Sequence, residues 1–143
     1  MKKLLLIFSL LLCNALASDI SLQKRELTKK EMKSQNKRIV QLASLEMSKS
    51  LPQKIDKYTK LISIKAQGST LIYIYEINTG AKSDTSVIKE DHSRMKEAVT
   101  RGTCKSSKKF LEADISLAYI YKSYKTKVKL FRFDVNKESC FRL

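Results

Sequence analysis

The stretch that decides the fold runs from Ile115 to Cys140 and reads ISLAYIYKSY, KTKVKLFRFDV and NKESC. Apolar and aromatic residues alternate with polar ones in both arms, with the two-residue period of half-buried strands. Val, Ile, Tyr and Phe fill most of the apolar positions, and these residue types favour strands. The stretch therefore predicts a β-hairpin that ends a few residues before Cys140.

The second arm of this hairpin contains a break in its pattern. Val128 and Leu130 share one face, whereas Phe131, Phe133 and Val135 share the other. An alternating strand changes face only when a residue is inserted, so the break predicts a β-bulge at Leu130-Phe131 or a second covered face.

A second hairpin is predicted from Leu61 to Ile77. Gly68-Ser69 gives it a two-residue turn, because glycine can adopt the positive φ of a type II′ turn. The strand after the turn, TLIYIYEI, is apolar on both faces, which is typical of a strand in the middle of a sheet. The segments LIYIYE (71–76) and LAYIYK (117–122) agree at four of six positions, and we interpret them as two central strands of one sheet.

Helices are predicted before and between the hairpins. Residues 18–50 contain no Gly or Pro and are rich in helix formers, and Pro52 should end this helix near Ser50. Residues 84–101 form the second helix, capped by Ser83 or Asp84 and ended by Gly102. The apolar residues expected to face the core are Ile39, Leu42, Ala43 and Met47 in the first helix and Ile88, Met95 and Val99 in the second.

Cys104 is expected in a basic loop, followed by one more helical turn from Lys108 to Ala113 with Phe110 and Leu111 facing inward. Together these elements predict an α+β fold in the order α-ββ-α-ββ. The expected sheet is antiparallel with about four strands, and the helices pack on one of its faces.

The first seventeen residues have the features of a secretory signal peptide. Lys2 and Lys3 precede the apolar run 4–12, and Ala15-Leu16-Ala17 supplies the small residues that signal peptidase requires. The predicted organisation is a signal peptide at 1–17, an N-terminal basic helix at 18–50 and an α+β domain at 51–143. We expect a periplasmic or secreted protein that has no transmembrane segment once the signal peptide is removed.

The cysteine count fits export. After cleavage Cys104 and Cys140 remain, and an even number in an exported chain is most simply one disulfide. Free thiols and a Cys-His metal site are the alternatives. Cys13 would be discarded with the signal peptide, whereas lipidation of Cys13 would require a small residue in place of Leu12.

The mature chain is strongly basic. Without Lys2 and Lys3 it carries 27 Lys and Arg against 14 Asp and Glu, a net charge of +13. Such a charge favours anionic partners such as lipid head groups, glycans, nucleic acid or an acidic protein face. Two groups of residues are candidate binding positions: Lys24, Arg25, Lys29, Lys30, Lys33, Lys37 and Arg38 in the first helix, and Lys122, Lys125, Lys127 and Lys129 in the last hairpin.

No constellation of residues indicates catalysis. His92 is the single histidine and is expected at the edge of a buried helix face, in a structural or surface role. The tyrosines 73, 75, 119 and 121 are expected mainly to face the core. Lysines near them in the sequence raise the alternative of base stacking on single-stranded nucleic acid. We expect no cofactor and no metal.

With these features placed, a resemblance can be stated. The order of elements resembles short exported bacterial proteins of unknown function. The residues that carry this resemblance are Leu51-Pro52, Asp56, Thr59, Tyr73, Tyr75, Cys104, Tyr119, Tyr121 and Cys140. In architecture the chain is also similar to the disulfide-bonded pilotins that help outer-membrane rings of type II secretion assemble.

The resemblance implies a non-catalytic envelope protein that binds another envelope protein as an accessory or assembly factor. The alternative is an exported protein that binds polyanions. The two can be told apart by salt, because binding to a polyanion weakens steeply as the ionic strength rises. The sequence leaves the partner and the oligomeric state open.

Overall fold

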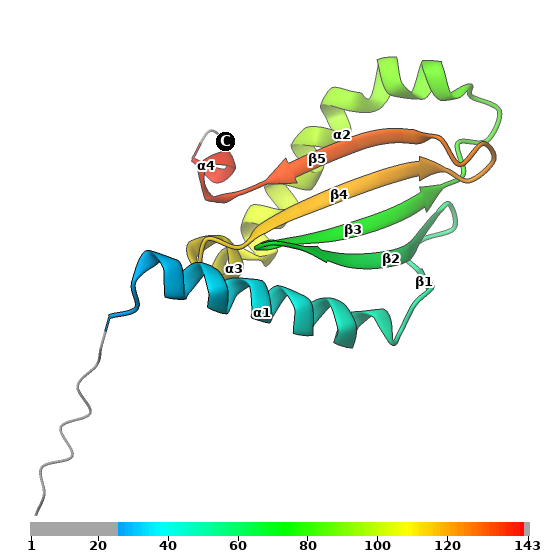
Figure 1. The fold of residues 1–143 in the computed structure, drawn as a ribbon. Coiled ribbons are helices and arrows are strands. Elements are labelled where there is room, and N and C mark those ends of the chain that lie inside the picture. The colour runs from blue at the N-terminus through cyan, green and yellow to red at the C-terminus, as the bar shows by residue number, and fades with distance from the viewer. Residues whose placement is uncertain (1–25, 142–143) are drawn as a thin grey trace, which may run out of the picture.

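The computed structural model describes residues 26–141, which form one five-stranded sheet with helices (Figure 1). The strands are β1 (Gln53–Lys54), β2 (Thr59–Gln67), β3 (Thr70–Ile77), β4 (Ser116–Ser123) and β5 (Lys129–Val135). The helices are α1 (Lys29–Ser48), α2 (Asp84–Ser106), α3 (Lys108–Glu112) and α4 (Lys137–Cys140). The strands lie in the sheet in sequence order.

The predicted α+β class is confirmed, but the sheet is mixed and not fully antiparallel. β3 and β4 pair in parallel, whereas the other neighbouring strands are antiparallel. The physical reason is the long α2 connection, which returns the chain to the end of the sheet where β3 began. The two-residue strand β1 was also missed, because so short a segment has no periodicity to detect.

Both hairpins are confirmed, and both contain irregularities. In the last hairpin Tyr121 pairs with Phe131 and Lys122 pairs with Lys129, so Leu130 is the inserted residue of the predicted bulge. A second register shift in β2 lies between Leu61 and Ser63. The insertion allows the consecutive residues Leu130 and Phe131 both to be buried.

The two similar segments are neighbours, as predicted. Leu71 pairs with Leu117, Tyr73 with Tyr119 and Tyr75 with Tyr121, without a shift in register. These central strands therefore present the same residue types at the same level of the sheet.

The buried side of α1 differs from the predicted stripe, of which Ala43 packs against the core whereas Ile39, Leu42 and Met47 are exposed. Val40 is 1% exposed and is buried together with Asn36 and Ser44, while Leu42 is 65% exposed. The Asn36 side chain donates to the Ala113 carbonyl at 2.6 Å, and the Ser44 hydroxyl donates to the Ile64 carbonyl at 3.1 Å. Small polar side chains with internal partners can face the sheet at little cost, and a count of large apolar residues overlooks them.

α2 begins as predicted, with the Ser83 hydroxyl accepting from the Ser86 backbone amide. Its course then differs in two respects. Val87 is buried whereas Ile88 is 39% exposed. The helix also continues through Gly102 to Ser106, so Cys104 lies in its last turns and not in a loop. The Gly102 prediction was wrong because tertiary contacts at Thr103 and Cys104 outweigh the weak helix propensity of glycine.

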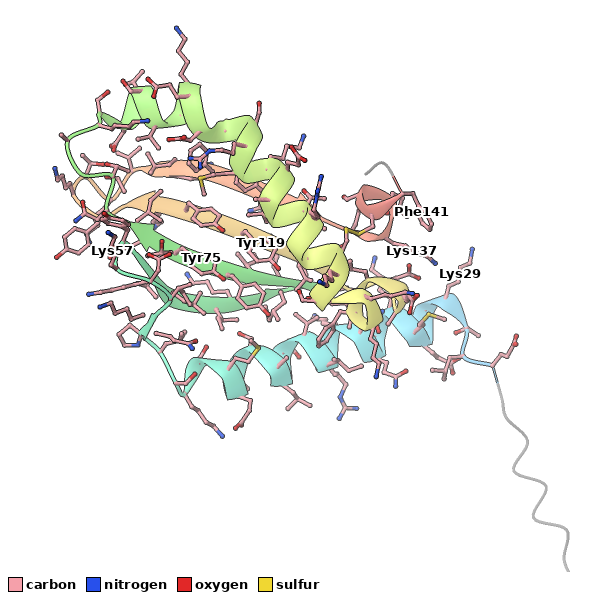
Figure 2. All side chains as sticks on the ribbon, turned by 180° about the vertical axis from the view of Figure 1, so that it is seen from behind. Lys29, Lys57, Tyr75, Tyr119, Lys137 and Phe141 are labelled. Carbon is pink, nitrogen blue, oxygen red and sulfur yellow. A yellow bond between two sulfur atoms is a disulfide. The ribbon has the colours of Figure 1, made fainter. Side chains whose placement is uncertain are left out.

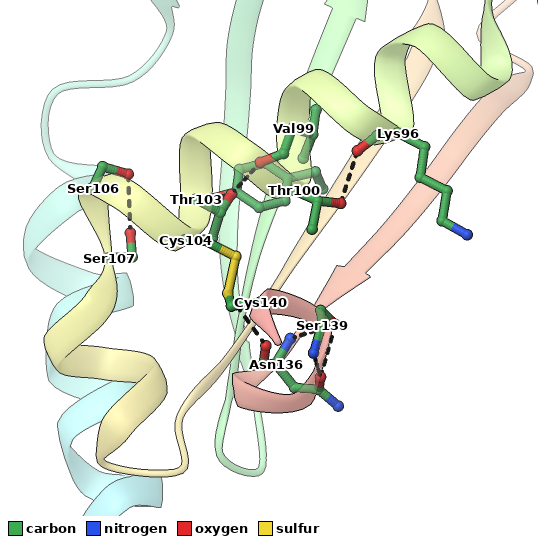
Figure 3. Close-up of a disulfide and its surroundings, with 11 residues drawn as sticks. Lys96, Val99, Thr100, Thr103, Cys104, Ser106, Ser107, Asn136, Ser139 and Cys140 are labelled. Carbon is green, nitrogen blue, oxygen red and sulfur yellow. Dashed lines mark hydrogen bonds between the residues drawn. A yellow bond between two sulfur atoms is a disulfide. The ribbon is translucent and has the colours of Figure 1, made fainter. Parts of the chain in front are cut away.

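The disulfide between Cys104 and Cys140 is confirmed and joins the end of α2 to α4 (Figure 3). Its Cα atoms are 5.6 Å apart. The N-terminus of α4 has a capping box, in which Asn136 and Ser139 exchange hydrogen bonds. The predicted turn at α3 is present, but only Leu111 faces inward, because Phe110 is 38% exposed.

The core lies between the sheet and the helices. One buried cluster contains Val40, Leu61, Ile64, Leu71, Leu111, Ile115, Leu117 and Val135, and a second contains Val87, Leu130, Phe131 and Phe133. The opposite face of the sheet carries a separate cluster of Ile72, Ile74 and Ala118, with Ile62 and Ile120 beside it. Within residues 26–141 no helix is both long and apolar enough to cross a membrane.

The corrected orientation of α1 predicts unequal effects at two neighbouring apolar positions. Val40→Ala should lower the free energy of unfolding by about 2 kcal/mol, because it removes buried methyl groups from the core. Leu42→Ala should change it by less than about 0.5 kcal/mol, because that side chain is exposed. Urea denaturation measures both values. A larger loss of unfolding free energy for Leu42→Ala than for Val40→Ala would show that Leu42 faces the core, as predicted from the sequence.

Candidate functional site

Four tyrosines form a stacked ladder on the face of the sheet that carries the helices. Tyr73 and Tyr119 have ring centroids 5.4 Å apart, and Tyr75 and Tyr121 have centroids 5.0 Å apart. Tyr75 also stacks with Tyr119 at 6.5 Å. The parallel register of β3 and β4 produces this arrangement, because it places alternate residues of each strand side by side. We call these four residues the tyrosine ladder.

The ladder is only half-buried, although it occupies the middle of the sheet. Figure 2 shows Tyr75 and Tyr119 between two helices on the same face of the sheet. α1 runs alongside β2, and α2 crosses the other side of that face. A solvent-facing aromatic surface of this kind differs from an ordinary core, where side chains are covered. The prediction that these tyrosines face the core therefore holds for their direction but not for full burial.

The tyrosine hydroxyls differ in their partners. The Tyr119 hydroxyl is bonded to the Thr103 hydroxyl at 2.9 Å, and the Tyr73 hydroxyl lies 3.9 Å from the Met47 sulfur. The hydroxyls of Tyr75 and Tyr121 have no protein partner in the part of the chain that is described. Every buried polar side-chain atom there has a partner, so these two hydroxyls reach solvent. They are available to bond with another molecule.

An open pocket of about 630 Å³ adjoins the ladder where β3 ends. Its apolar lining comes from Ile77 of β3, from Val87 and Met95 of α2 and from the Tyr58 ring of the β1–β2 loop. Ile77, Met95 and Tyr121 pack against the same core cluster, and Ile77 follows Tyr75 by two residues on one face of β3, so the pocket lies beside the ladder. Sequence analysis missed Val87, because Ile88 next to it gave the stronger apolar signal.

Charged residues surround this pocket. Asp91 accepts from Arg94 at 2.7 Å, and Lys82 lies 3.7 Å from the same carboxylate. The hydrogen bond from Arg94 is the main reason that the pKa of Asp91 is lowered. The Asp56 carboxylate accepts from the backbone amides of Tyr58 and Thr59, and the first of these bonds chiefly lowers the Asp56 pKa. The rim is therefore charged while the floor is apolar and aromatic.

The structure separates the candidate lysines into two regions. Lys29, Lys30, Lys33, Lys37 and Arg38 are exposed on the first part of α1. Lys122, Lys125, Lys127 and Lys129 lie at the opposite end of the molecule, where β4 ends and β5 begins (Figure 1). Lys24 and Arg25 fall outside the described residues, as does the whole predicted signal peptide. The two basic groups do not form one patch.

The ladder and the lysines of β4 and β5 lie on opposite faces of the sheet. Tyr121 and Lys122 are consecutive residues of one strand, so their side chains point in opposite directions. The base-stacking interpretation requires aromatic rings and lysines on the same surface. The opposite placement of rings and lysines therefore gives no support to base stacking on the tyrosine ladder.

His92 has a packing role, which agrees with its predicted position. Its ring lies 5.4 Å from Phe133 and 6.0 Å from Phe131. It also lines an open polar pocket with Glu97 and Asp134. Within residues 26–141 no group of three or more His, Cys, Asp or Glu side chains could hold a metal ion.

Residues 34–131 match the sequence profile of a domain of unknown function, DUF8479. The chain belongs to this family. The match extends from α1 to β5 and includes the whole tyrosine ladder and Cys104. The predicted likeness to exported proteins of unknown function thus corresponds to a defined family. No curated protein has a matching sequence.

Solved structures with the same fold come from bacteria. A Pseudomonas aeruginosa protein inferred to be secreted has a TM-score of 0.65 at 15% identity, over 80% of this chain and 99% of its own. The type 2 secretion pilotin EpsS of Vibrio vulnificus has a TM-score of 0.64 at 15% identity, over 78% of this chain and 96% of its own. The type II secretion pilotin AspS of Vibrio cholerae has a TM-score of 0.59 at 21% identity, over 78% and 97%. The predicted likeness in architecture to pilotins is therefore confirmed for the fold.

The ladder predicts a late ionisation of tyrosine. Burial raises the pKa of Tyr73 and of Tyr121 to about 12, and it also raises the pKa of Tyr75 and Tyr119. Above pH ~10 the unfolded chain releases phenolic protons that the folded protein retains. The stability due to this difference is complete below pH ~10 and is lost as the pH rises toward ~12.

Ultraviolet absorbance of tyrosinate against pH measures this effect. A component of the six tyrosines should ionise only above pH ~11 and should shrink in the double variant Tyr75→Phe, Tyr121→Phe. Ionisation of all tyrosines in a single step near pH ~10 would contradict a half-buried ladder.

Proposed function

We propose that this protein is an exported, non-catalytic accessory factor that binds another envelope protein of a secretion-type machine through the tyrosine ladder and its adjoining pocket. The observation that carries the proposal is the half-buried ladder. Four stacked, half-buried rings occupy the helix-bearing face between α1 and α2, and two of their hydroxyls have no partner among residues 26–141.

The chemistry of this surface suits a protein partner. Aromatic residues and methionine are enriched in the cores of protein interfaces, and charged residues gather at the rim. Here Met47 contacts Tyr73, Met95 packs against the core cluster that Tyr121 also contacts, and Asp91 and Arg94 line the adjoining pocket. Tyrosine loses little conformational freedom on binding, and its hydroxyl can bond to backbone groups of the partner. The occupant that fits is an amphipathic helix lying between α1 and α2.

Three further observations support export and an envelope role. The disulfide suits an oxidising compartment, and the N-terminal sequence has the features of a signal peptide. Proteins that share the fold include two type II secretion pilotins. Lipidation is not part of the proposal, because Leu12 precedes Cys13.

The test is affinity purification of the epitope-tagged protein from chemically cross-linked cells of the producing bacterium, with mass spectrometry of what is recovered. Met47→Glu and Met95→Glu each place a charge on the proposed surface. Each should reduce recovery of one envelope protein at least tenfold, which corresponds to about 1.4 kcal/mol.

Leu45→Glu is the matched control. Leu45 is 68% exposed in the same turn of α1 as Met47, and it lines the side of the helix near Ala66, away from the ladder. This variant should bind as the unchanged protein does, and melting temperatures confirm that all three variants fold. Equal losses for Leu45→Glu and Met47→Glu, or no envelope protein above background, would refute the proposal.

A further inference from the structure

The uncovered face of the sheet carries a row of charged residues that crosses all five strands, with a lysine on four of them. Lys54 of β1 pairs with Lys60 of β2, Lys60 pairs with Glu76 of β3, Glu76 pairs with Lys122 of β4, and Lys122 pairs with Lys129 of β5. Residues that are direct partners across strands project to the same face. We call Lys54, Lys60, Lys122 and Lys129 the lysine row.

The row contains like charges that disfavour folding. Lys54 lies opposite Lys60, and Lys122 lies opposite Lys129, and like charges at opposed positions destabilise a sheet. The single carboxylate in the row, Glu76, forms an ion pair with Lys127, with 2.8 Å between Oε1 and Nζ. Four lysines against one carboxylate leave the row with a net positive charge.

Two loops at the same end add both lysines and exposed apolar side chains. The β1–β2 loop carries Ile55 and Tyr58, and the β4–β5 loop carries Tyr124 and Val128, each about half exposed. Lys57 lies 4.6 Å from the centre of the Tyr58 ring, and Lys127 lies 4.7 Å from the centre of the Tyr124 ring. The residues with exposed apolar groups are thus interleaved with lysines.

A small open pocket of about 210 Å³ brings these parts together. Its lining includes Tyr58 and Tyr124 from the two loops and Lys54, Lys57 and Lys60. The two carboxylates in the lining have partners, because Asp56 accepts from backbone amides and Glu76 pairs with Lys127. The lining therefore carries three ammonium groups against two carboxylates, which leaves a net positive charge between two aromatic side chains.

We propose that this end of the sheet binds an anionic phospholipid bilayer, with the lysine row and the pocket contacting phosphate groups and the two loops entering the head-group region. Lysines near an anionic membrane are attracted to it, and tyrosine is typical of the membrane interface. Nucleic acid fits less well, because the tyrosine ladder that could stack bases lies on the other face.

The inference is independent of the proposed function. The lysine row lies on the face opposite the tyrosine ladder, and although Tyr58 lines the pockets of both sites, the variants that test the two proposals share no residue. The failure of either proposal leaves the other standing.

The first test is co-sedimentation of the exported protein with vesicles. The protein should bind vesicles of phosphatidylglycerol and phosphatidylethanolamine, and it should not bind vesicles of phosphatidylcholine alone. The triple variant Lys54→Gln, Lys60→Gln, Lys122→Gln should bind about 100-fold more weakly, at about fivefold for each lysine.

The matched control removes the same charge from the first part of α1, as Lys29→Gln, Lys33→Gln, Lys37→Gln. It should lose less than about fivefold, because these lysines lie at the other end of the molecule. Circular dichroism confirms that both triple variants fold. Equal losses for the two variants would show a general effect of net charge and would overturn the site.

The second test uses the fact that the sequence contains no tryptophan. Tyr124→Trp places a single fluorophore in the proposed contact, and its emission should shift to the blue with anionic vesicles. Phe141→Trp is the control, because Phe141 is 79% exposed and lies at the end of the molecule opposite Lys57 (Figure 2). An unchanged spectrum at position 124, or binding of single-stranded DNA without binding of vesicles, would refute the proposal.

Discussion

The parallel pairing of β3 with β4 is the interaction on which the rest of the structure depends. Eight consecutive residue pairs, from Thr70 with Ser116 to Ile77 with Ser123, align without a shift. The pairing brings the tyrosines together on one face, and on the other it places Glu76 beside Lys122. A slip of one residue would exchange the two faces of a strand. The disulfide and α2 support this register, because α2 spans the connection and Cys104 ties its end to α4.

Much of the fold could be predicted from alternation and turn chemistry. Both hairpins, the bulge at Leu130 and the adjacency of the two similar strands follow from local pattern. The parallel direction could not be predicted in this way, because a strand that is apolar on both faces pairs equally well in either direction. The buried face of α1 was missed because Asn36 and Ser44 find their partners in segments distant in the sequence. Such partners appear only when the chain is folded.

The candidate site was partly visible in the sequence. The tyrosines could be identified by their repetition, and their place on central strands followed from it. Their half-exposed state could not, because it depends on how far apart α1 and α2 lie over the sheet. The lysine row has no sequence pattern, since Lys54, Lys60, Lys122 and Lys129 come from four strands. Only the register of the sheet makes these residues neighbours.

The account therefore assigns different contacts to two surfaces that one pairing creates: a protein at the tyrosine ladder and a membrane at the lysine end. Photocrosslinking in living cells tests this assignment most directly, with a photoreactive benzoylphenylalanine placed at Tyr75 in one strain and at Tyr124 in another. The account predicts a cross-link from position 75 to one envelope protein and from position 124 to phospholipid. Cross-links from both positions to the same protein, or none from position 75, would contradict it.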